Sequence, residues 1–429
     1  MLPSALILAA GTSPDADILG LVRDSLLALA LLIMAAKLGG EAMARLGQPP
    51  VLGELLIGTI LGNLSLAGVT ALEPLKNSEV LHLVAEIGVV LLLFEVGLES
   101  DLFKLLAVGW SSLLVATLGV VVPMILGYFV SMFFLPEASP LTHLFVGATL
   151  TATSVGITAR VLKDLHAADT KEAHIILGAA VADDVIGLVV LAVVSGLVMA
   201  SASGQGGFSW GATLWIILKA CGFLAVAVLA GRYVADRAFH HVAKLKVPGA
   251  LLAWCICFCF VLAALAAAVG LAPIVGAFAA GLVLDRVHFH TFLARGERQV
   301  EELLFPITTL IVPVFFFMMG MRVDLRSFAA GPVLAFAVVI TLAAIAGKQI
   351  CGLGVLEKGV NRLAVGVGMI PRGEVGLIFA GIGSSLVLNG QPLFSKTTFS
   401  ALVFMVMLTT FLTPPALKMA LGRKPRKKS

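Results

Sequence analysis

The chain has 429 residues, of which 59% are hydrophobic and 13% are charged, with a mean hydropathy of +1.06 and a formal charge of +4 at pH 7. Soluble globular proteins carry about 45–50% apolar and about 25% charged residues, so both fractions indicate a chain that lies in lipid. The composition excludes a secreted enzyme, a nucleic-acid-binding protein and a two-domain cytosolic protein. Since an open sheet edge cannot lie in hydrocarbon, the prediction is an all-α polytopic membrane protein.

The apolar runs predict about thirteen transmembrane helices, because a bilayer core of ~30 Å needs about 20 apolar residues per helix. In chain order they cover residues 18–38, 50–68, 80–98, 107–134, 141–162, 173–200, 209–235, 248–269, 271–284, 302–321, 331–355, 361–388 and 397–420. Residues 1–17 are expected to form an extracytoplasmic leader, and residues 421–429 a basic cytoplasmic tail. The region between them, 18–420, is one transmembrane domain.

The distribution of Lys and Arg between the loops predicts the orientation in the membrane. If the C-terminus is cytoplasmic, 21 basic residues fall on the cytoplasmic side. The opposite side then carries only Lys76, Arg322, Arg326 and Lys396. We therefore expect a multi-pass protein of the cell membrane with its N-terminus outside and its C-terminus in the cytoplasm.

Two segments recur 223 residues apart in the chain. Pro50–Gly58 (PVLGELLIG) aligns with Pro273–Gly281 (PIVGAFAAG), and Phe94–Leu102 (FEVGLESDL) aligns with Phe317–Leu325 (FMMGMRVDL). These matches relate the second and third spans to the ninth and tenth, a shift of seven helices. An odd shift inserts the two halves in opposite orientation, which predicts the inverted-topology repeat of secondary transporters. The alternative is that apolar helices rich in Gly and Pro resemble one another by composition alone.

Asp183 and Asp184 lie in the middle of an apolar span, where ionised side chains are costly and tend to be functional. Adjacent helical residues point about 100° apart, so the two carboxylates need different neighbours. One of them should be paired with a cation or protonated, because two ionised carboxylates in a low dielectric are expensive. Carboxylate oxygens bind either a hard cation or a proton, and that competition is the basis of cation/proton exchange.

Lys348 lies deep in the eleventh span and is expected to pair with one of the two aspartates. The alternative is that its side chain snorkels to the cytoplasmic interface. No transport role is assigned to the remaining ionisable residues in or near the spans, which are Arg23, Glu54, His82, Glu86, Glu95 and Lys219.

Two spans have the sequence of interrupted helices. The fifth contains Thr149–Gly156 (TLTATSVG), which is rich in hydroxyls, and the twelfth contains Met369–Gly376 (MIPRGEVG), which holds Pro, Gly and two charges. Aligning their Val-Gly dipeptides makes them equivalent positions of the two repeats. Paired discontinuous helices indicate a transporter binding site, and Arg372 and Glu374 are placed to neutralise the half-helix ends. A proline kink with a local Arg–Glu pair is the alternative.

Three of these runs together resemble the signatures of the monovalent cation:proton antiporter-2 family. They are TATSVGITARVLKDL (151–165), AAVADDVIGLVVLAV (179–193) and PRGEVGLIFAGIG (371–383), and the resemblance extends over about residues 18–420. The Asp-Asp doublet resembles the sodium/proton branch, because the potassium-efflux branch typically has Gln-Asp there.

The resemblance implies thirteen helices, two crossing broken helices, a homodimer and elevator-like alternation of access. It places dimerisation helices around 18–68 and 209–284 and core ion-transport helices around 80–200 and 302–420. Asp184 would be the main ion- and proton-binding carboxylate and Asp183 the partner of Lys348. Thr153 and Ser154 would lie at one break and bind the ion and proton together with Asp183 and Asp184, and Arg372 and Glu374 would support the broken helix at the other break.

The expected function is exchange of protons for Na⁺, with Li⁺ as a further substrate, and it is expected to be electrogenic. Neither enzymatic activity, a cofactor nor a nucleic-acid partner is expected. The closest alternative is a K⁺/H⁺ antiporter of the potassium-efflux type without its nucleotide-binding domain. A sodium-coupled symporter, an intramembrane aspartyl protease and a channel are more distant alternatives. Ion selectivity, stoichiometry and the dimer interface are not determined by the sequence.

Overall fold

The computed structural model describes residues 14–99, 109–165, 167, 170–202, 247, 249–284, 299–388 and 390–422, with part of 215–237. In this part of the chain the protein is almost entirely helical, as predicted. Eight helices are long and apolar enough to cross a membrane, or nine if one bent pair forms a single span. About half of the predicted seventh span, 209–235, lies outside the described residues, so the number of thirteen stays a prediction.

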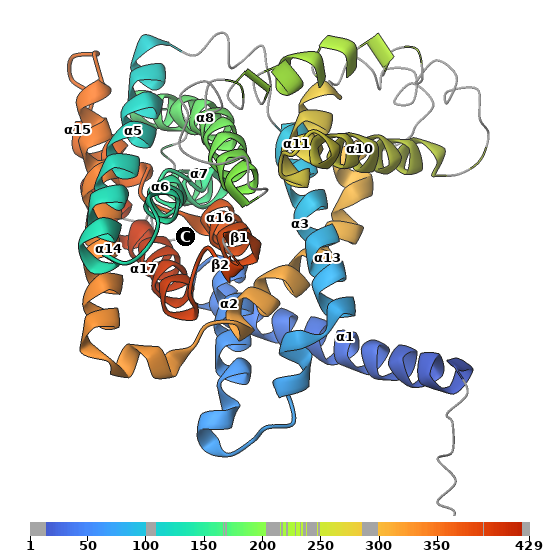
Figure 1. Cartoon of the computed structure of the whole chain (residues 1–429). Coiled ribbons are helices and arrows are strands. Elements are labelled where there is room, and N and C mark those ends of the chain that lie inside the picture. The colour runs from blue at the N-terminus through green and yellow to red at the C-terminus, as the bar shows by residue number, and fades with distance from the viewer. Residues whose placement is uncertain are drawn as a thin grey trace, which may run out of the picture.

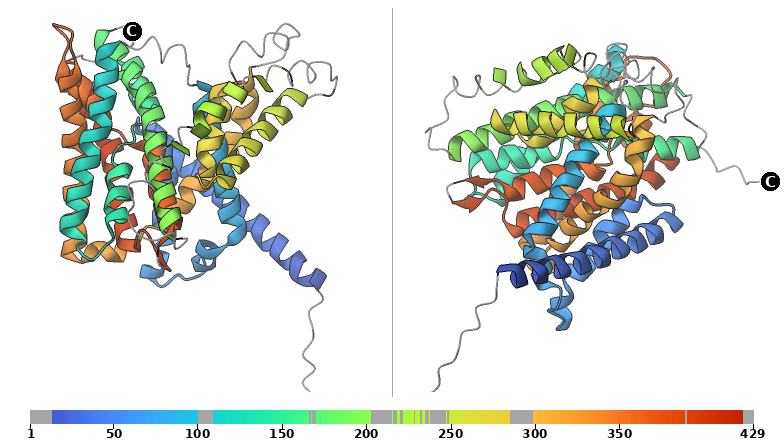
Figure 2. Two further views of the ribbon diagram at one scale, coloured as in Figure 1. Left: turned by 45° about the horizontal axis from the view of Figure 1, so that its top comes forward. Right: turned by 90° about the vertical axis from the view of Figure 1, so that its right-hand side faces the viewer.

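The helices form two bundles side by side (Figures 1 and 2). The first, which we call the scaffold bundle, contains α1 (Pro14–Arg45), α2 (Pro50–Gly62), α3 (Glu79–Glu99), α10 (Ala250–Ala268), α11 (Pro273–Val283) and α13 (Val300–Met321). The short 3₁₀ turns η1 (Leu64–Ala67) and η2 (Glu73–Asn77) connect α2 to α3. The first helix begins at Pro14, so the last residues of the predicted leader are helical.

The second bundle, the core bundle, contains both predicted helix breaks. Its elements are α5 (Trp110–Phe134), α6 (Pro140–Thr149), α7 (Val155–Asp164), α8 (Lys171–Ala202), α14 (Gly331–Ile350), η5 (Cys351–Gly354), α15 (Arg362–Gly368), α16 (Gly373–Ser385) and α17 (Lys396–Ala420). The turn η4 (Leu325–Ala329) joins α13 to α14, and a short antiparallel hairpin, β1 (Val387–Leu388) and β2 (Gln391–Pro392), precedes α17.

Local sequence signals explain where several of these helices begin. Pro50 and Pro273 occupy the first turns of α2 and α11, where a missing N–H costs nothing. Ser139 caps α6 by accepting the Thr142 N–H, and Asn361 caps α15. These caps fix the ends of the short half-helices around which the breaks are built.

Packing within the scaffold bundle has the symmetry that the repeated segments predict. A Cβ at Gly58 of α2 would collide with the Phe317 carbonyl oxygen of α13. A Cβ at Gly281 of α11 would collide in the same way with the Phe94 carbonyl oxygen of α3. Gly281 and Phe317 follow Gly58 and Phe94 by 223 residues each, so the two contacts are equivalent. The helices of one repeat therefore pack on the other repeat through paired glycine contacts that no larger residue can make.

The division between the bundles differs from the predicted one at α3 and α13. The sequence boundaries put these two helices with the ion-transport core, whereas in the structure they pack chiefly on α2 and α11. The difference has a physical cause, since the close glycine contacts require α3 and α13 to lie directly against the helices that they cross. Which bundle moves and which forms a dimer stays a prediction.

Candidate functional site

Two broken helices meet inside the core bundle. One break separates α6 from α7, and the other separates α15 from α16, which are bent by 48°. The Ser154 N–H donates to the Pro371 carbonyl oxygen at 2.7 Å, so the two breaks touch through their backbones. Gly373 lies next to the Ser154 side chain with a φ of 45°, a conformation that favours glycine. The predicted discontinuous crossing helices are confirmed.

Side chains join the two breaks at residues related by the repeat. The Ser154 hydroxyl donates to the Glu374 carboxylate at 3.0 Å, and Arg372 Nη1 donates to the Ala152 carbonyl oxygen at 2.8 Å. Both pairs are separated by 220 residues, the offset that aligns the two breaks in the sequence. A residue that contacts its own repeat partner lies close to the pseudo-twofold axis, so these bonds mark the axis of the core bundle.

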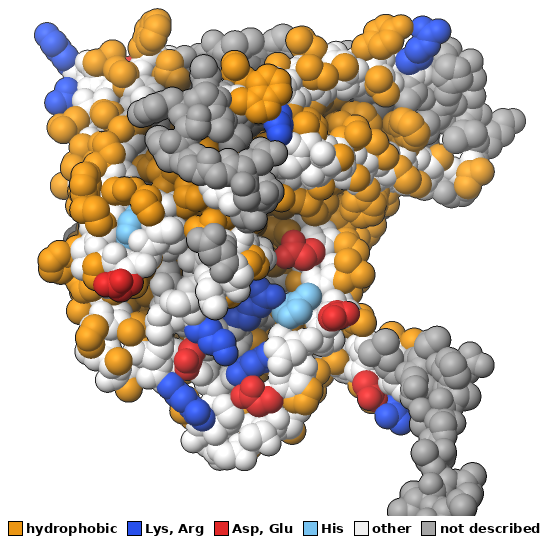
Figure 3. Space-filling view, in the orientation of Figure 1, with side chains coloured by type: hydrophobic (Ala, Val, Ile, Leu, Met, Phe, Trp, Pro, Cys, Tyr) orange, Lys and Arg blue, Asp and Glu red, His pale blue; other side chains and the backbone are white. Residues whose placement is uncertain are grey.

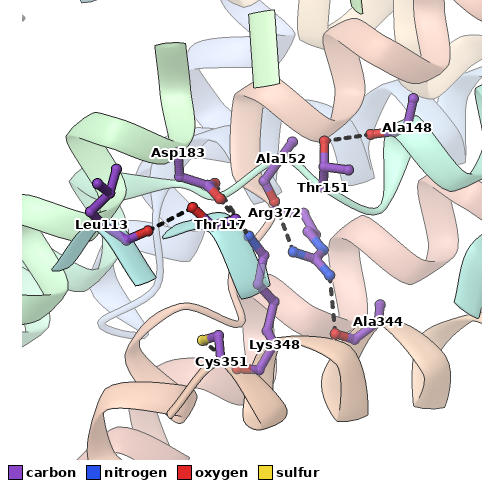
Figure 4. A network of polar contacts seen from close by, with 10 residues as sticks. All are labelled: Leu113, Thr117, Ala148, Thr151, Ala152, Asp183, Ala344, Lys348, Cys351 and Arg372. Carbon is purple, nitrogen blue, oxygen red and sulfur yellow. Dashed lines mark hydrogen bonds and ion pairs between the residues drawn. The ribbon is translucent and has the colours of Figure 1, made fainter. Parts of the chain in front are cut away.

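Arg372 is fully buried and joins the first break to α14 through backbone oxygens. Besides the bond to Ala152, its Nη2 donates to the Ala344 carbonyl oxygen of α14 at 3.0 Å (Figure 4). Ala152 lies in the break beyond the end of α6, where carbonyl groups lack a partner within the helix, so a cation there supplies both a hydrogen bond and charge. Glu374 lies in the first turn of α16, where the helix dipole favours an anion. Arg372 and Glu374 thus have separate partners, unlike the alternative of a local Arg–Glu pair.

Lys348 and Asp183 form a buried ion pair between α14 and α8. The Lys348 Nζ lies 3.0 Å from Asp183 Oδ1 and 3.2 Å from Oδ2, and the two side chains are 0% and 1% exposed. Figure 4 shows the lysine reaching from α14 to the carboxylate. Gly119 of α5 faces the pair, and a Cβ there would lie 3.2 Å from Nζ. The lysine therefore does not snorkel to an interface, and the absent side chain at Gly119 leaves room for its ammonium group.

Asp184 and Thr153 supply oxygen atoms near these contacts. Asp184 is half-buried on α8 and lies on a different face of the helix from its neighbour Asp183. Thr153 lies in the first break and is 2% exposed. Its Oγ1 has no hydrogen-bond partner in the part of the chain that the structure describes. A buried hydroxyl without a partner is unusual and is suited to receiving a ligand.

The structure thus gathers the residues that the sequence singled out into two clusters. Ser154, Glu374 and Arg372 lie at the crossing of the breaks, and Asp183 and Lys348 form the ion pair. Sequence reasoning missed Gly119 and the carbonyl groups that accept from Arg372. No local signal could have found them, because they act only through helices that are distant in the sequence.

Comparison with known proteins identifies the family. The family profile described as "Sodium/hydrogen exchanger, transmembrane" matches residues 6–422. The chain belongs to the sodium/hydrogen exchanger family. It is 37% identical to the high-affinity Na⁺/H⁺ antiporter NhaS3 of Synechocystis, covering 96% of this chain and 93% of that protein. It is 34% identical to the Na⁺/H⁺-K⁺ antiporter GerN of Bacillus cereus, covering 92% of this chain and 96% of GerN.

A solved structure shares the fold of this family member. The sodium proton antiporter MjNhaP1 of Methanocaldococcus jannaschii superposes with a TM-score of 0.69 at 16% identity, covering 94% of this chain and 97% of that chain. The likeness extends over nearly the whole length of both proteins. The arrangement of bundles and broken helices described above is therefore an antiporter fold.

Proposed function

We propose that this protein exchanges Na⁺ for H⁺ across the cell membrane by alternating access. The observation that carries the proposal is the buried Lys348–Asp183 pair next to Asp184, in a bundle where two broken helices cross. Family membership and the names of the relatives NhaS3 and GerN support Na⁺ and H⁺ as the ions. The gradients of the two ions supply the energy, so no resident cofactor is needed.

In this proposal Asp184 holds either the proton or the metal ion. Na⁺ prefers oxygen ligands, and the open Thr153 hydroxyl and the two carboxylates offer them. Ser154, Arg372 and Glu374 hold the crossing in shape, because the Ser154 hydroxyl donates to Glu374 and the two terminal nitrogens of Arg372 donate to backbone carbonyl groups. Protonation of Asp184 neutralises the site and displaces the ion.

Asp183 and Lys348 add a second charge to the cycle. When Na⁺ draws the Asp183 carboxylate away, Lys348 loses its counter-ion in a site that water does not reach. A buried ammonium without a counter-ion tends to release its proton. If Lys348 releases its proton, one proton leaves from Lys348 and one from Asp184 for each Na⁺ that binds. The exchange then moves net charge. Measured stoichiometry at clamped voltage tests this step separately from the role of Asp184.

The wider setting is also a proposal. We infer that the core bundle moves against the scaffold bundle, that two copies associate through scaffold helices, and that the C-terminus lies in the cytoplasm. The concentration of Lys and Arg on one side of the predicted spans supports this orientation. Labelling of single cysteines from each side of the membrane tests it.

The Asp184→Asn variant tests the central role. In proteoliposomes with an imposed pH gradient, it should lose Na⁺-dependent proton flux while retaining the fold. Asp24→Asn, at an exposed carboxylate of α1, is the matched control and should exchange normally. Full Na⁺-dependent flux in Asp184→Asn would rule out this mechanism. Repeating the assay with K⁺ and Li⁺ tests selectivity, since the relative GerN is named a Na⁺/H⁺-K⁺ antiporter.

A further inference from the structure

A charged cleft separates the two bundles on the side of the α2–α3 connection. It is lined by His82 and Glu86 of α3, by Arg322 at the end of α13, and by α16 residues that include Ile382. Figure 3 shows Lys, Arg, Asp, Glu and His side chains gathered in the lower centre of one face of the molecule. The cleft therefore lies where α16 of the core bundle would slide past α3 and α13 of the scaffold bundle.

The contacts of His82 require the neutral form of its ring. His82 Nε2 lies 2.9 Å from the Lys76 carbonyl oxygen, which can only accept a hydrogen bond. His82 Nδ1 lies 2.9 Å from Nη2 of Arg322, which can only donate. The ring must therefore carry its proton on Nε2 and a lone pair on Nδ1. A second proton would replace the Nδ1 bond with two N–H groups facing each other and would set two positive charges in contact.

Arg322 extends this contact to the core bundle. Its Nη1 donates to the Ser384 hydroxyl of α16 at 3.5 Å, at the long limit of a hydrogen bond. One guanidinium group thus touches α3 of the scaffold and α16 of the core. Because the bond to Ser384 is weak, the position of Arg322 depends on the firmer bond to His82.

The other charged groups around this contact balance one another or lie on the scaffold side. Glu86 lies one turn further along α3 and attracts Arg322, and Lys76 pairs with Glu73 at 3.2 Å. The other charged residues in the segments next to this contact, 63–82 and 322–330, are Glu79, Asp324 and Arg326. From α11 and from the α16 residues that line the cleft, no titratable side chain faces His82 among the described residues.

We propose that His82 and Arg322 form a proton-sensitive latch that closes this cleft. With His82 neutral, Arg322 is held against α16 and the two bundles stay in contact on this side. When His82 is protonated, it repels Arg322, the bond to Ser384 is lost and the cleft opens to water. The inference rests on the proposed function, because it assigns the opening to the side from which protons enter. On the predicted orientation, that side is extracytoplasmic.

Cleft opening can be measured without transport. The Ile382→Cys variant places a thiol in the lining of the cleft, at a position that takes no part in the latch. The readout is the rate at which a membrane-impermeant maleimide modifies this cysteine, divided by its rate with free glutathione at the same pH. This ratio should rise about fivefold or more between about pH 8 and about pH 5, where histidine titrates. The chain without this cysteine gives the background from the native thiols.

Two variants separate the latch from a general effect of acid. His82→Gln can accept from Arg322 and donate to the Lys76 carbonyl but cannot gain a charge, so its labelling should stay low at both pH values. Arg322→Gln should label rapidly at both. His174→Gln, at an exposed position of α8, is the matched control and should respond like the parent.

Transport then gives a second readout. Acid on the cleft side should accelerate exchange by the parent protein. His82→Gln should lose this acceleration without a change in KM for Na⁺ on the opposite side. The latch is overturned if acid raises the labelling of His82→Gln as much as that of the parent. It is also overturned if acid does not raise the labelling of the parent. Both conclusions hold whatever the flux. Normal labelling in a chain that does not exchange Na⁺ would instead count against the proposed function and leave the latch intact.

Discussion

Removing Lys348 gives the sharpest test of how the site is held together. Lys348→Gln leaves Asp183 buried between α8 and α14 without the ammonium group that lies 3.0 Å away. The carboxylate must then take up a proton or remain charged in a site that water does not reach. Either outcome destabilises the folded protein, because the cost of burying the carboxylate is no longer offset.

The size of the effect follows from the burial of both partners. Breaking a buried pair by removing one partner costs about 3–5 kcal/mol. An unfolding entropy of about 2.1 cal/mol/K per residue, taken over the 429-residue chain, is about 0.9 kcal/mol/K, so Tm should fall by ~3–6 °C. The partly exposed Lys76–Glu73 pair provides the contrast, since pairs that remain in contact with solvent contribute about 1 kcal/mol or less. Lys76→Gln should therefore shift Tm by about 1 °C at most.

The assay is a double-mutant cycle in detergent with Tm as the readout. Asp183→Asn and Lys348→Gln should each destabilise the protein, and the double variant should be more stable than the sum of the single effects predicts, since it leaves no unpaired charge. Proteoliposome flux is measured in parallel, because Lys348→Gln should also alter the voltage dependence or the pH profile. If the two single effects simply add, the pair does not act as a unit and the reasoning fails.

Two further predictions concern packing and a loop. Gly58→Ala should strongly reduce the yield of folded protein, because its methyl group would collide with the Phe317 carbonyl, whereas Gly20→Ala, with nothing within 4 Å, should fold normally in a detergent gel-filtration assay. The Ser111 hydroxyl of α5 donates to Glu357 in the loop after η5 and holds the pKa of that carboxyl below its usual value. A lowered carboxyl pKa stabilises the fold above the unfolded-state pKa and loses that effect as pH falls, so the Tm difference between the parent and Ser111→Ala should shrink toward acid pH.

The features that the sequence predicted well are those with a local or repeated signal. Charged residues inside long apolar runs singled out Asp183 and Lys348, because lipid tolerates such groups only with a partner. The Gly, Pro and hydroxyl residues around Thr153 and Arg372 indicated the helix breaks. The recurrence of Pro50–Gly58 indicated the inverted repeat, and the equivalent glycine contacts agree with it.

What could not be predicted depends on which helices become neighbours. Nothing in the sequence around Gly119 indicates that an ammonium group lies against it. The partners of Arg372 are carbonyl groups, which every residue has, so side-chain identity carries no information about them. His82 was assigned no transport role and Arg322 was counted only for the orientation in the membrane, because their contact, between residues 240 apart, exists only where α3 and α13 come together.

The contrast between packing and charge in the two repeats bears on how access alternates. The scaffold contact of Gly58 with Phe317 is matched by that of Gly281 with Phe94, and inverted repeats of this kind give the two access states similar packing. The charges are not matched. In the sequence order α17 corresponds to α8 but carries no carboxylate, and α5 corresponds to α14 but carries no Lys or Arg. A ligand shifts the population of two states only through its different affinity for each, so the unmatched charged site is where ion and proton binding can drive the exchange.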